Sequence, residues 1–186
     1  MIRVGLIGED PYDKVSLKNL LAKKFPKVHF QPLLKGIRGN GLDSPKTARA
    51  LAEELKSEKF KLLIFIRDLD GLPSQTDLKK KVEEWFAPLK HKAQDILLMN
   101  IWELETLIFG DIDVFNKKYG VSVRFSGDPM MINNPKEKLM HETYKAKSKF
   151  QQSDCPDIFS LLDIDKVAAK CKYFDDFLIE FKRKVK

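Results

Sequence analysis

The chain has few cysteines and histidines and no long hydrophobic run, and each shortage removes a class of protein. Its two cysteines, Cys155 and Cys171, do not form a Cys-x-x-Cys pair, and its three histidines are scattered singly. No spacing therefore indicates a zinc site. No apolar stretch approaches the roughly 20 residues of a membrane-spanning helix, and a strand pattern stands where a secretion signal would begin. We expect a cytoplasmic protein with reduced thiols and no membrane partner.

The chain also lacks blocks of like charge, repeats and a nucleotide-binding loop. Its formal net charge of +7 comes from lysines and arginines dispersed over 186 residues. This excess favours nucleic acid as a partner only weakly, because a lysine-rich soluble surface gives the same balance. No Gly-x-x-x-x-Gly-Lys-Ser/Thr motif occurs, so an ATPase would have to be a separate protein.

Short apolar runs alternate with helical patterns in the first part of the chain. We expect strands over residues 2–7, 28–34, 62–67 and 96–101, and helices over residues 15–25, 47–56 and 77–86. Ser44 is the expected N-cap of the second helix, with Pro45 in its first turn. This alternation predicts an α/β fold with a mainly parallel sheet flanked by helices.

The pattern becomes mostly helical after the fourth strand. We expect a short edge strand over residues 121–125 and a mobile, lysine-rich loop over residues 145–157. Helices are expected over residues 102–109, 114–119 and 135–144, from Asp163 or Asp165, and from Phe174 to the end. The sequence therefore predicts an α/β core over residues 1–110 and a mostly helical C-terminal extension over residues 111–186, packed on the core.

Acidic residues follow the first and third predicted strands. Glu9 and Asp13 lie in the first loop, and Asp68 and Asp70 lie in the third. Loops that follow neighbouring parallel strands open at the same edge of the sheet, so these carboxylates should converge. Unpaired carboxylates about 4 Å apart repel by roughly 4 kcal/mol at an effective dielectric constant near 20, so the cluster needs a counter-charge. A hard divalent cation, Mg²⁺ or Mn²⁺, is suited to that role.

The two loops also resemble motifs of a known family. Glu9, followed by a turn and an apolar helix, resembles the opening motif of TOPRIM domains, and Asp68-Leu69-Asp70-Gly71 resembles their Asp-x-Asp motif. Later segments, residues 102–111, 134–139, 144–145 and 171–177, look like those of a small bacterial TOPRIM-like family. That family is similar to the nuclease half of OLD-type (overcoming lysogenization defect) phage-defence enzymes. The resemblance implies a TOPRIM-like (Rossmann-like) core.

The resemblance further implies a metal-dependent nuclease. In OLD-like nucleases the corresponding acids hold one or two divalent metals, which here implies Mg²⁺ or Mn²⁺ at Glu9, Asp13, Asp68 and Asp70. Glu9, Asp68 and Asp70 are then also the catalytic candidates. The substrate is expected to be nucleic acid, DNA more than RNA, and an ATPase partner protein is expected because relatives of this kind often have one.

Other residues are candidates for the same site on weaker signals. Glu103 and Glu105, after the fourth strand, could extend the metal cluster, although one of them could equally be an exposed glutamate at a helix start. Lys145 and Lys147 are the candidates for the lysine that OLD-like nucleases place near the scissile phosphate. The glycine-rich loop over residues 35–41 could contact a phosphate backbone or be a simple connector.

Three alternatives stay open. Asp68-Leu69-Asp70-Gly71 also looks like the nucleophile motif of haloacid-dehalogenase (HAD-like) phosphatases, although that family usually has it on its opening strand. Receiver domains have a Mg²⁺-binding acidic pair like Glu9-Asp10 and a phosphorylatable aspartate like Asp68. They also carry a Lys-Pro pair, which does not occur here. The third alternative is a TOPRIM-like binding or regulatory subunit that has lost catalysis.

Overall fold

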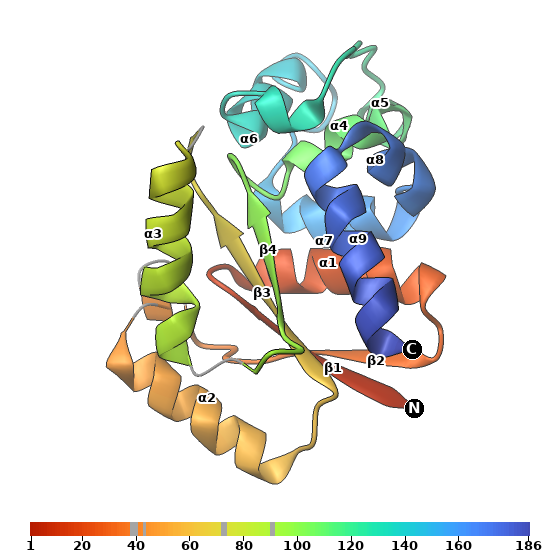
Figure 1. Ribbon diagram of the computed structural model, residues 1–186. Helices are drawn as coiled ribbons and strands as arrows, with labels where there is room; N and C mark the ends of the chain where they lie inside the picture. Colours follow the sequence, from red (N-terminus) through yellow and green to blue (C-terminus); the bar gives the residue numbers. More distant parts are fainter. Residues whose placement is uncertain (38–40, 43, 72–73, 90–91) are drawn as a thin grey trace.

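A single parallel sheet forms the centre of the protein. The computed structural model describes residues 1–37, 41–42, 44–71, 74–89 and 92–186. Its strands are β1 (Ile2–Gly8), β2 (Val28–Pro32), β3 (Leu62–Asp68) and β4 (Ile96–Asn100). All neighbouring strands are parallel, in the order β2-β1-β3-β4 (Figure 1). The predicted α/β class with a mainly parallel sheet is confirmed.

Both faces of the sheet are buried, which explains why the first five residues of β3 are all apolar. Leu63 and Phe65 join one hydrophobic cluster, whereas Ile64 and Ile66 join another. Successive side chains of a strand point to opposite faces, so these two clusters lie on opposite sides of the sheet. A parallel sheet covered on both faces reads as a continuous hydrophobic run.

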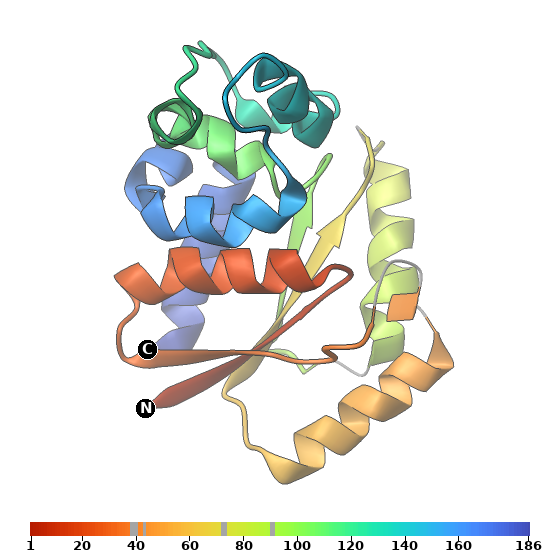
Figure 2. The same cartoon turned by 180° about the vertical axis from the view of Figure 1, so that it is seen from behind.

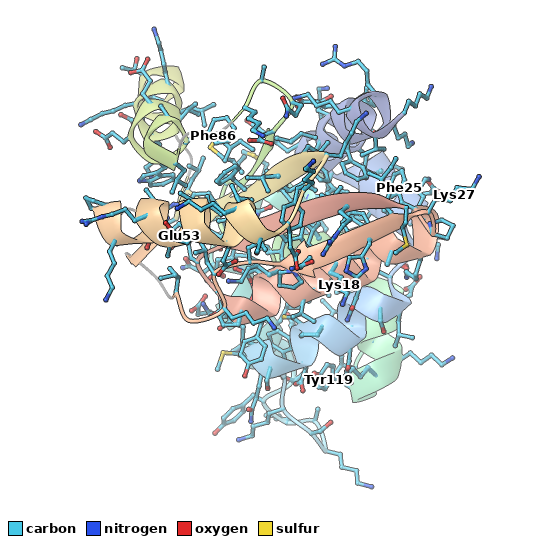
Figure 3. All side chains as sticks on the ribbon, turned by 90° about the horizontal axis from the view of Figure 1, so that it is seen from below. Lys18, Phe25, Lys27, Glu53, Phe86 and Tyr119 are labelled. Carbon is cyan, nitrogen blue, oxygen red and sulfur yellow. The ribbon has the colours of Figure 1, made fainter. Side chains whose placement is uncertain are left out.

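Two helices cover one face of the sheet. They are α2 (Pro45–Ser57) and α3 (Gln75–Trp85), followed by the short 3-10 turn η2 (Ala87–Leu89). The Oγ of Ser44 accepts a hydrogen bond of 3.2 Å from the backbone N–H of Thr47, as expected for the N-cap of α2. Phe86, which follows α3 and is labelled in Figure 3, packs edge-on against Phe65 at 5.0 Å between ring centroids.

The other face is covered by α1 (Pro11–Lys24) and by the last of the C-terminal helices, and the rest of the C-terminal helices pack beside these two or lie beyond the carboxyl ends of the strands (Figures 1 and 2). The C-terminal helices are α4 (Thr106–Gly110), α5 (Ile112–Tyr119), α6 (Pro135–Glu142), α7 (Cys155–Leu161), α8 (Ile164–Lys170) and α9 (Lys172–Val185). Two 3-10 turns, η3 (Pro129–Met131) and η4 (Gln152–Asp154), lie between them. None of the described helices is long and apolar enough to cross a membrane.

The C-terminal helices share a hydrophobic core with the sheet. One cluster includes Leu6 of β1, Leu17 of α1, Phe159 of α7 and Phe181 of α9, all fully buried. Phe25, just after α1, packs edge-on against Phe181 at 4.9 Å between ring centroids (Figure 3). Because this cluster continues past residue 110, the extension and the α/β core are stabilised by the same buried apolar surface.

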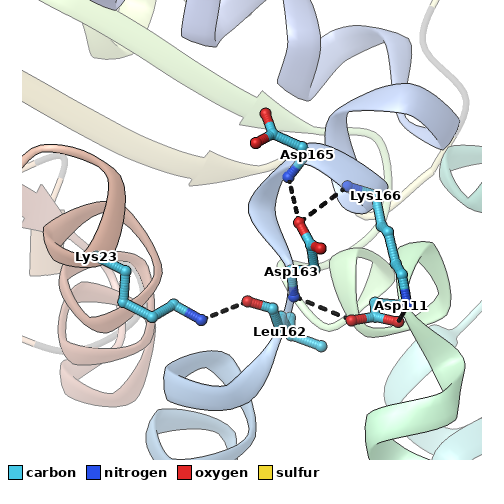
Figure 4. A network of polar contacts seen from close by, with 6 residues as sticks. All are labelled: Lys23, Asp111, Leu162, Asp163, Asp165 and Lys166. Atoms are coloured by element: carbon cyan, nitrogen blue, oxygen red, sulfur yellow. Dashed lines mark hydrogen bonds and ion pairs between the residues drawn. The ribbon is translucent and has the colours of Figure 1, made fainter.

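A polar network fixes the turn between α7 and α8 against its neighbours (Figure 4). The buried side chain of Asp111 accepts a 2.9 Å hydrogen bond from the backbone N–H of Asp163. The same carboxylate forms an ion pair with Nζ of Lys166 at 3.3 Å. On the other side of the turn, Lys23 of α1 donates to the carbonyl oxygen of Leu162. Side chains from α1 and from the α4–α5 junction therefore hold the same turn.

The expected edge strand over residues 121–125 is wrong. The backbone N–H and C=O of Val123 are instead paired with the side-chain amide of Asn116, both at 2.9 Å. Phe125 packs against Phe109 at 5.6 Å between ring centroids. One asparagine side chain thus takes the hydrogen bonds that a neighbouring strand would have made.

Two other C-terminal expectations need correction. The helix expected from Trp102 begins only at Thr106, after a turn. The loop expected over residues 145–157 ends earlier, because α7 begins at Cys155. Cys155 and Ile158 of α7 are buried in the shared core, and this tertiary burial outweighs the polar local composition.

The contact between α4 and α8 gives a test of this packing. A Cβ added at Gly110 would lie 2.9 Å from Cα of Val167. We expect Gly110→Ala to lower the free energy of unfolding by about 1–3 kcal/mol because backbone has to move. Thermal unfolding followed by circular dichroism measures this. Gly36→Ala is the control, since nothing lies within 4 Å of a Cβ there. Equal melting temperatures for the two variants would contradict this packing.

Candidate functional site

A pocket of about 260 Å³ lies beyond the carboxyl ends of β1, β3 and β4 and is lined mainly by acidic side chains. Its described lining consists of Glu9, Asp10, Asp13, Asp68, Asp70, Glu103, Glu105, Lys136 and Gln152. All six acids named from the sequence as metal ligands line this one pocket. Seven carboxylates and one lysine give it a strong excess of negative charge.

The start of α1 presents the first group of acids. Asp10 is the N-cap, and its Oδ1 accepts a 2.6 Å hydrogen bond from the backbone N–H of Tyr12. Pro11 occupies the first helical position and Asp13 lies in the first turn. Acidic side chains are favourable there because the unpaired N–H groups of a helix start carry partial positive charge. The sequence that begins α1 therefore also delivers carboxylates to the pocket.

Glu9 is held by a buried arginine. Nε of Arg67 lies 3.0 Å from Oε1 of Glu9, and the guanidinium of Arg67 stacks 3.7 Å from the ring centroid of Trp85 in α3. Arg67 is buried beside the aromatic ring, so its charge is little screened by water. This ion pair orients Glu9 and neutralises one of the pocket's negative charges.

The ends of β3 and β4 present the second group. Oδ1 of Asp68 accepts a 2.8 Å hydrogen bond from Nδ2 of Asn100 at the end of β4. The backbone N–H of Leu69 donates to the carbonyl oxygen of Asn100 at 3.0 Å, so the pairing continues past both strands. Asp70 is exposed and has a φ of 54°, in the left-handed region, which aspartate tolerates better than most residues. The turn that carries Asp68 and Asp70 is therefore fastened to β4.

Asp13 is buried without a partner. Its residue is only 7% exposed, and no described residue makes a hydrogen bond or an ion pair with its carboxylate. Burial, followed by the nearby charges of Asp68 and Glu105, raises the pKa of Asp13 well above its usual value. An ionised carboxylate in this position is unfavourable unless a cation joins it.

The segment after β4 contributes two glutamates, one paired with a lysine and one buried without an ion pair to a described residue. Glu103 accepts two hydrogen bonds from Lys136, one from the side-chain Nζ at 2.6 Å and one from the backbone N–H of Lys136 at 3.1 Å. Glu103 is thereby joined to the first turn of α6. Glu105 is 2% exposed, and burial, assisted by the charge of Glu103, raises its pKa to about 7. The thiol of Cys155 lies 3.9 Å from Oε1 of Glu105. The alternative that one of these glutamates is an exposed residue at a helix start is therefore wrong, because neither side chain is exposed.

The two lysines expected to be catalytic lie elsewhere. Lys145 and Lys147 are exposed in the loop after α6, outside the described lining of the pocket, so their catalytic role stays a prediction. The described lysine that lines the pocket is Lys136. The glycine-rich loop over residues 35–41 cannot be compared with its expected role, because residues 38–40 lie outside the described residues.

Sequence reasoning considered Asp10 only for the receiver-like alternative, and it missed Asn100, Lys136 and Gln152. Asp10 and Asn100 carry a recognisable signal, since each stands where a predicted strand gives way to a loop. Lys136 lies in a segment that was matched to the family but was not assigned to the site. Gln152 reaches the pocket from η4 and has no local signal at all.

The donor chemistry of the pocket fits a hard divalent cation. Carboxylate oxygens from three segments meet there, and a hard cation such as Mg²⁺ binds oxygen ligands. Within the described residues, no three histidine, cysteine or acidic side chains are arranged to hold a metal ion as they stand. Mg²⁺ usually takes only one or two protein carboxylates and fills its remaining positions with water or substrate. The unpartnered carboxylate of Asp13 is the feature that a bound cation would satisfy.

Comparison with known proteins identifies a family. Residues 9–182 match the family described as "Domain of unknown function (DUF4276)". The chain belongs to this family. The matched region begins at Glu9 and includes every described residue that lines the pocket. No curated protein and no solved structure matches the chain.

The isolated charge of Asp13 leads to a stability prediction. In EDTA at pH 8, Asp13→Asn should raise the free energy of unfolding by on the order of 1 kcal/mol, because it removes an unpaired buried charge and keeps the side chain's shape. Because the pKa of Asp13 is raised in the folded state, the penalty exists at high pH and is lost as pH falls. The advantage of the variant should therefore shrink as the pH falls toward about 4, the ordinary pKa of an aspartate.

Thermal unfolding in EDTA at several pH values measures this effect. Asp113→Asn is the control, since Asp113 is exposed in the first turn of α5 and its removal should bring no gain in stability. If Asp13→Asn melts below wild type at pH 8 in EDTA, the charge of Asp13 is satisfied in some other way.

Proposed function

We propose that this protein is a Mg²⁺- or Mn²⁺-dependent nuclease of the TOPRIM type that hydrolyses nucleic-acid phosphodiester bonds at the acidic pocket. The observation that carries the proposal is the largely buried carboxylate of Asp13, which has no hydrogen bond or ion pair with a described residue, in a pocket where acids from three strand ends meet. Such a group is stable when it is protonated, and when it is ionised it needs a cation beside it. The resemblance of the two acidic loops to TOPRIM motifs then supports phosphodiester chemistry at that place.

The balance of charge supports a cation as part of the working site. Among the lining acids, Glu9 pairs with Arg67 and Glu103 pairs with Lys136. The other five acids have no ion pair with a described lysine or arginine. A phosphodiester is itself an anion, so it would be repelled from the pocket as it stands. A pocket this acidic suits a phosphate substrate only when divalent cations are bound first.

Each residue then has a defined task. Glu9, Asp13, Asp68 and Asp70 would hold one or two ions, with Glu105 as a buried neighbour. A bound divalent ion activates water and stabilises charge on the leaving oxygen of a phosphodiester. The chain's own contribution is orientation. Arg67 fixes Glu9, and the amide of Asn100 fixes one oxygen of Asp68.

Substrate, partner and place in the cell extend the same proposal. The net charge of +7 supports a nucleic-acid substrate, with DNA favoured over RNA by the resemblance to OLD-type enzymes. That resemblance also supports a separate ATPase partner and a phage-defence role. The free and buried thiols of Cys155 and Cys171 support a reducing, cytoplasmic setting.

Phosphotransfer is the second candidate, and the position of Asp68 favours it. Asp68 is the last residue of β3, in a sheet whose order, β2-β1-β3-β4, begins like that of flavodoxin-like folds. Receiver-like proteins are phosphorylated on an aspartate at this point. In that case Asp68 would be modified covalently, whereas a metal-dependent nuclease needs no covalent intermediate.

Metal binding provides the first test of the proposal. Millimolar Mn²⁺ should raise the melting temperature of wild type, because a ligand at about 100 times its dissociation constant stabilises the folded state by about 2.7 kcal/mol. Asp13→Asn should lose most of this shift, whereas Asp113→Asn should keep it. Differential scanning calorimetry in EDTA and in Mn²⁺ measures both. An unchanged wild-type melting temperature would remove the metal from the proposal.

Cleavage assays provide the second test. With Mn²⁺ and short DNA or RNA, we expect Glu9→Gln and Asp70→Asn each to reduce cleavage by at least 100-fold, on the order of 3 kcal/mol of barrier. Loss of cleavage in these two variants, purified identically to wild type, excludes a contaminating nuclease, and Asp113→Asn should cut like wild type as the control for replacement of an acid. Full activity in Glu9→Gln with none in Asp70→Asn would overturn the assignment of the site. A phosphoaspartate at Asp68, detected by intact-mass spectrometry, would favour phosphotransfer.

A further inference from the structure

An exposed loop with an aromatic residue and three lysines lies between two segments that reach the pocket. This lysine loop, residues 144–149, reads Tyr-Lys-Ala-Lys-Ser-Lys. Tyr144 is 67% exposed, and Nζ of Lys149 lies 5.0 Å from the centroid of its ring. Tyr144 is the most exposed aromatic side chain among the described residues. The shared hydrophobic core does not include Tyr144, so the core gives no reason for its presence.

The lysine loop is firmly closed at its base. Oγ1 of Thr143, which is fully buried, donates to the carbonyl oxygen of Leu139 at 3.1 Å and accepts from the backbone N–H of Phe150 at 2.9 Å. Phe150 is buried against Phe115, with 5.8 Å between ring centroids. The two ends of the loop are thereby held together on the core, while Tyr144 and the lysines project from it.

The position of the loop relates it to the acidic pocket. Lys136 lines the pocket at the start of α6, and Gln152 lines it just after the loop. α6 has eight residues, which corresponds to a length of about 12 Å, and it ends at Glu142, two residues before Tyr144. α6 lies beyond the ends of β3 and β4 (Figure 1). One short helix on one side and residues 150–151 on the other therefore separate the lysine loop from residues that line the pocket.

We propose that the lysine loop binds single-stranded nucleic acid next to the pocket, with Tyr144 stacked on an unpaired base and the loop lysines on the phosphates. This inference rests on the proposed nuclease function, which it extends to a substrate class. Aromatic side chains combined with positive charge are the features with which proteins hold single strands. A duplex base has both faces covered by its neighbours in the stack, so a single exposed ring finds no partner on it.

The distribution of charge favours binding of the strand by the lysine loop and cleavage at the pocket. The pocket is strongly acidic, and the described side chains of the lysine loop carry three positive charges and no negative one. A nucleic-acid strand is repelled by the pocket without metal but attracted by the loop. The loop therefore holds the strand, and the pocket acts on a phosphodiester a short distance along it.

Binding without metal tests this inference separately from catalysis. Fluorescence anisotropy in EDTA and low salt would compare a labelled single-stranded DNA of 12 nucleotides with the matching duplex. Tyr144→Ala should weaken single-strand binding by roughly 5- to 150-fold, the range expected for one stacked base, and leave duplex binding unchanged. Tyr144→Phe should bind like wild type because it keeps the ring. Tyr173→Ala is the control, since Tyr173 is also an exposed tyrosine but lies on α9.

Each outcome decides the inference. Normal single-strand binding by Tyr144→Ala, an equal loss for single strand and duplex, or an equal loss in Tyr173→Ala would overturn it, as would no binding by wild type. Specific loss in Tyr144→Ala supports it even if Mn²⁺ produces no cleavage, and in that case only the proposed nuclease activity fails. Cleavage without any effect of Tyr144→Ala on binding would retain the activity and remove the lysine loop as its substrate contact.

Discussion

The parallel pairing of β3 with β1 on one side and β4 on the other is the interaction on which the rest of the molecule depends. Parallel strands all end at the same edge of a sheet, so the loops after these three strands have to meet. Each of those loops is acidic, and their meeting concentrates seven carboxylates at one pocket. The two buried faces of the sheet also fix the register, because a slip by one residue would move each side chain into the cluster on the opposite face, which is packed for other side chains.

The concentration of negative charge has structural consequences around the pocket. Arg67 is buried between Glu9 and the ring of Trp85, and Lys136 joins Glu103 to the first turn of α6. These contacts connect α3 and α6 to the pocket and reduce its charge in part. Asp13 receives no such partner among the described residues. Unbalanced negative charge in a pocket is characteristic of functional sites, because perturbed pKa values cluster there.

The fold class and the acids of the pocket were predictable from local patterns. Apolar runs separated by helical spacing indicated a parallel sheet, and Ser44 and Pro45 marked the start of α2 correctly. The convergence of Glu9 with Asp68 follows from chain direction alone. The expected strand over residues 121–125 was wrong because the side chain of Asn116 takes the hydrogen bonds of Val123, and no local pattern indicates that pairing. The expected loop up to residue 157 was wrong because burial of Cys155 stabilises a helix that its polar neighbours do not favour.

The sequence by itself determined which strands form, which loops are acidic and at which edge of the sheet they open, since these depend on periodicity and chain direction. Only the tertiary structure decided that Asp13 is buried without a partner, that Asn100 holds Asp68, and that Lys136 and Gln152 complete the lining. These contacts join residues far apart in the chain. They depend on how α6 and η4 are placed by the packing of the C-terminal helices against α1 and β4, and that packing depends on side-chain shapes across the whole core.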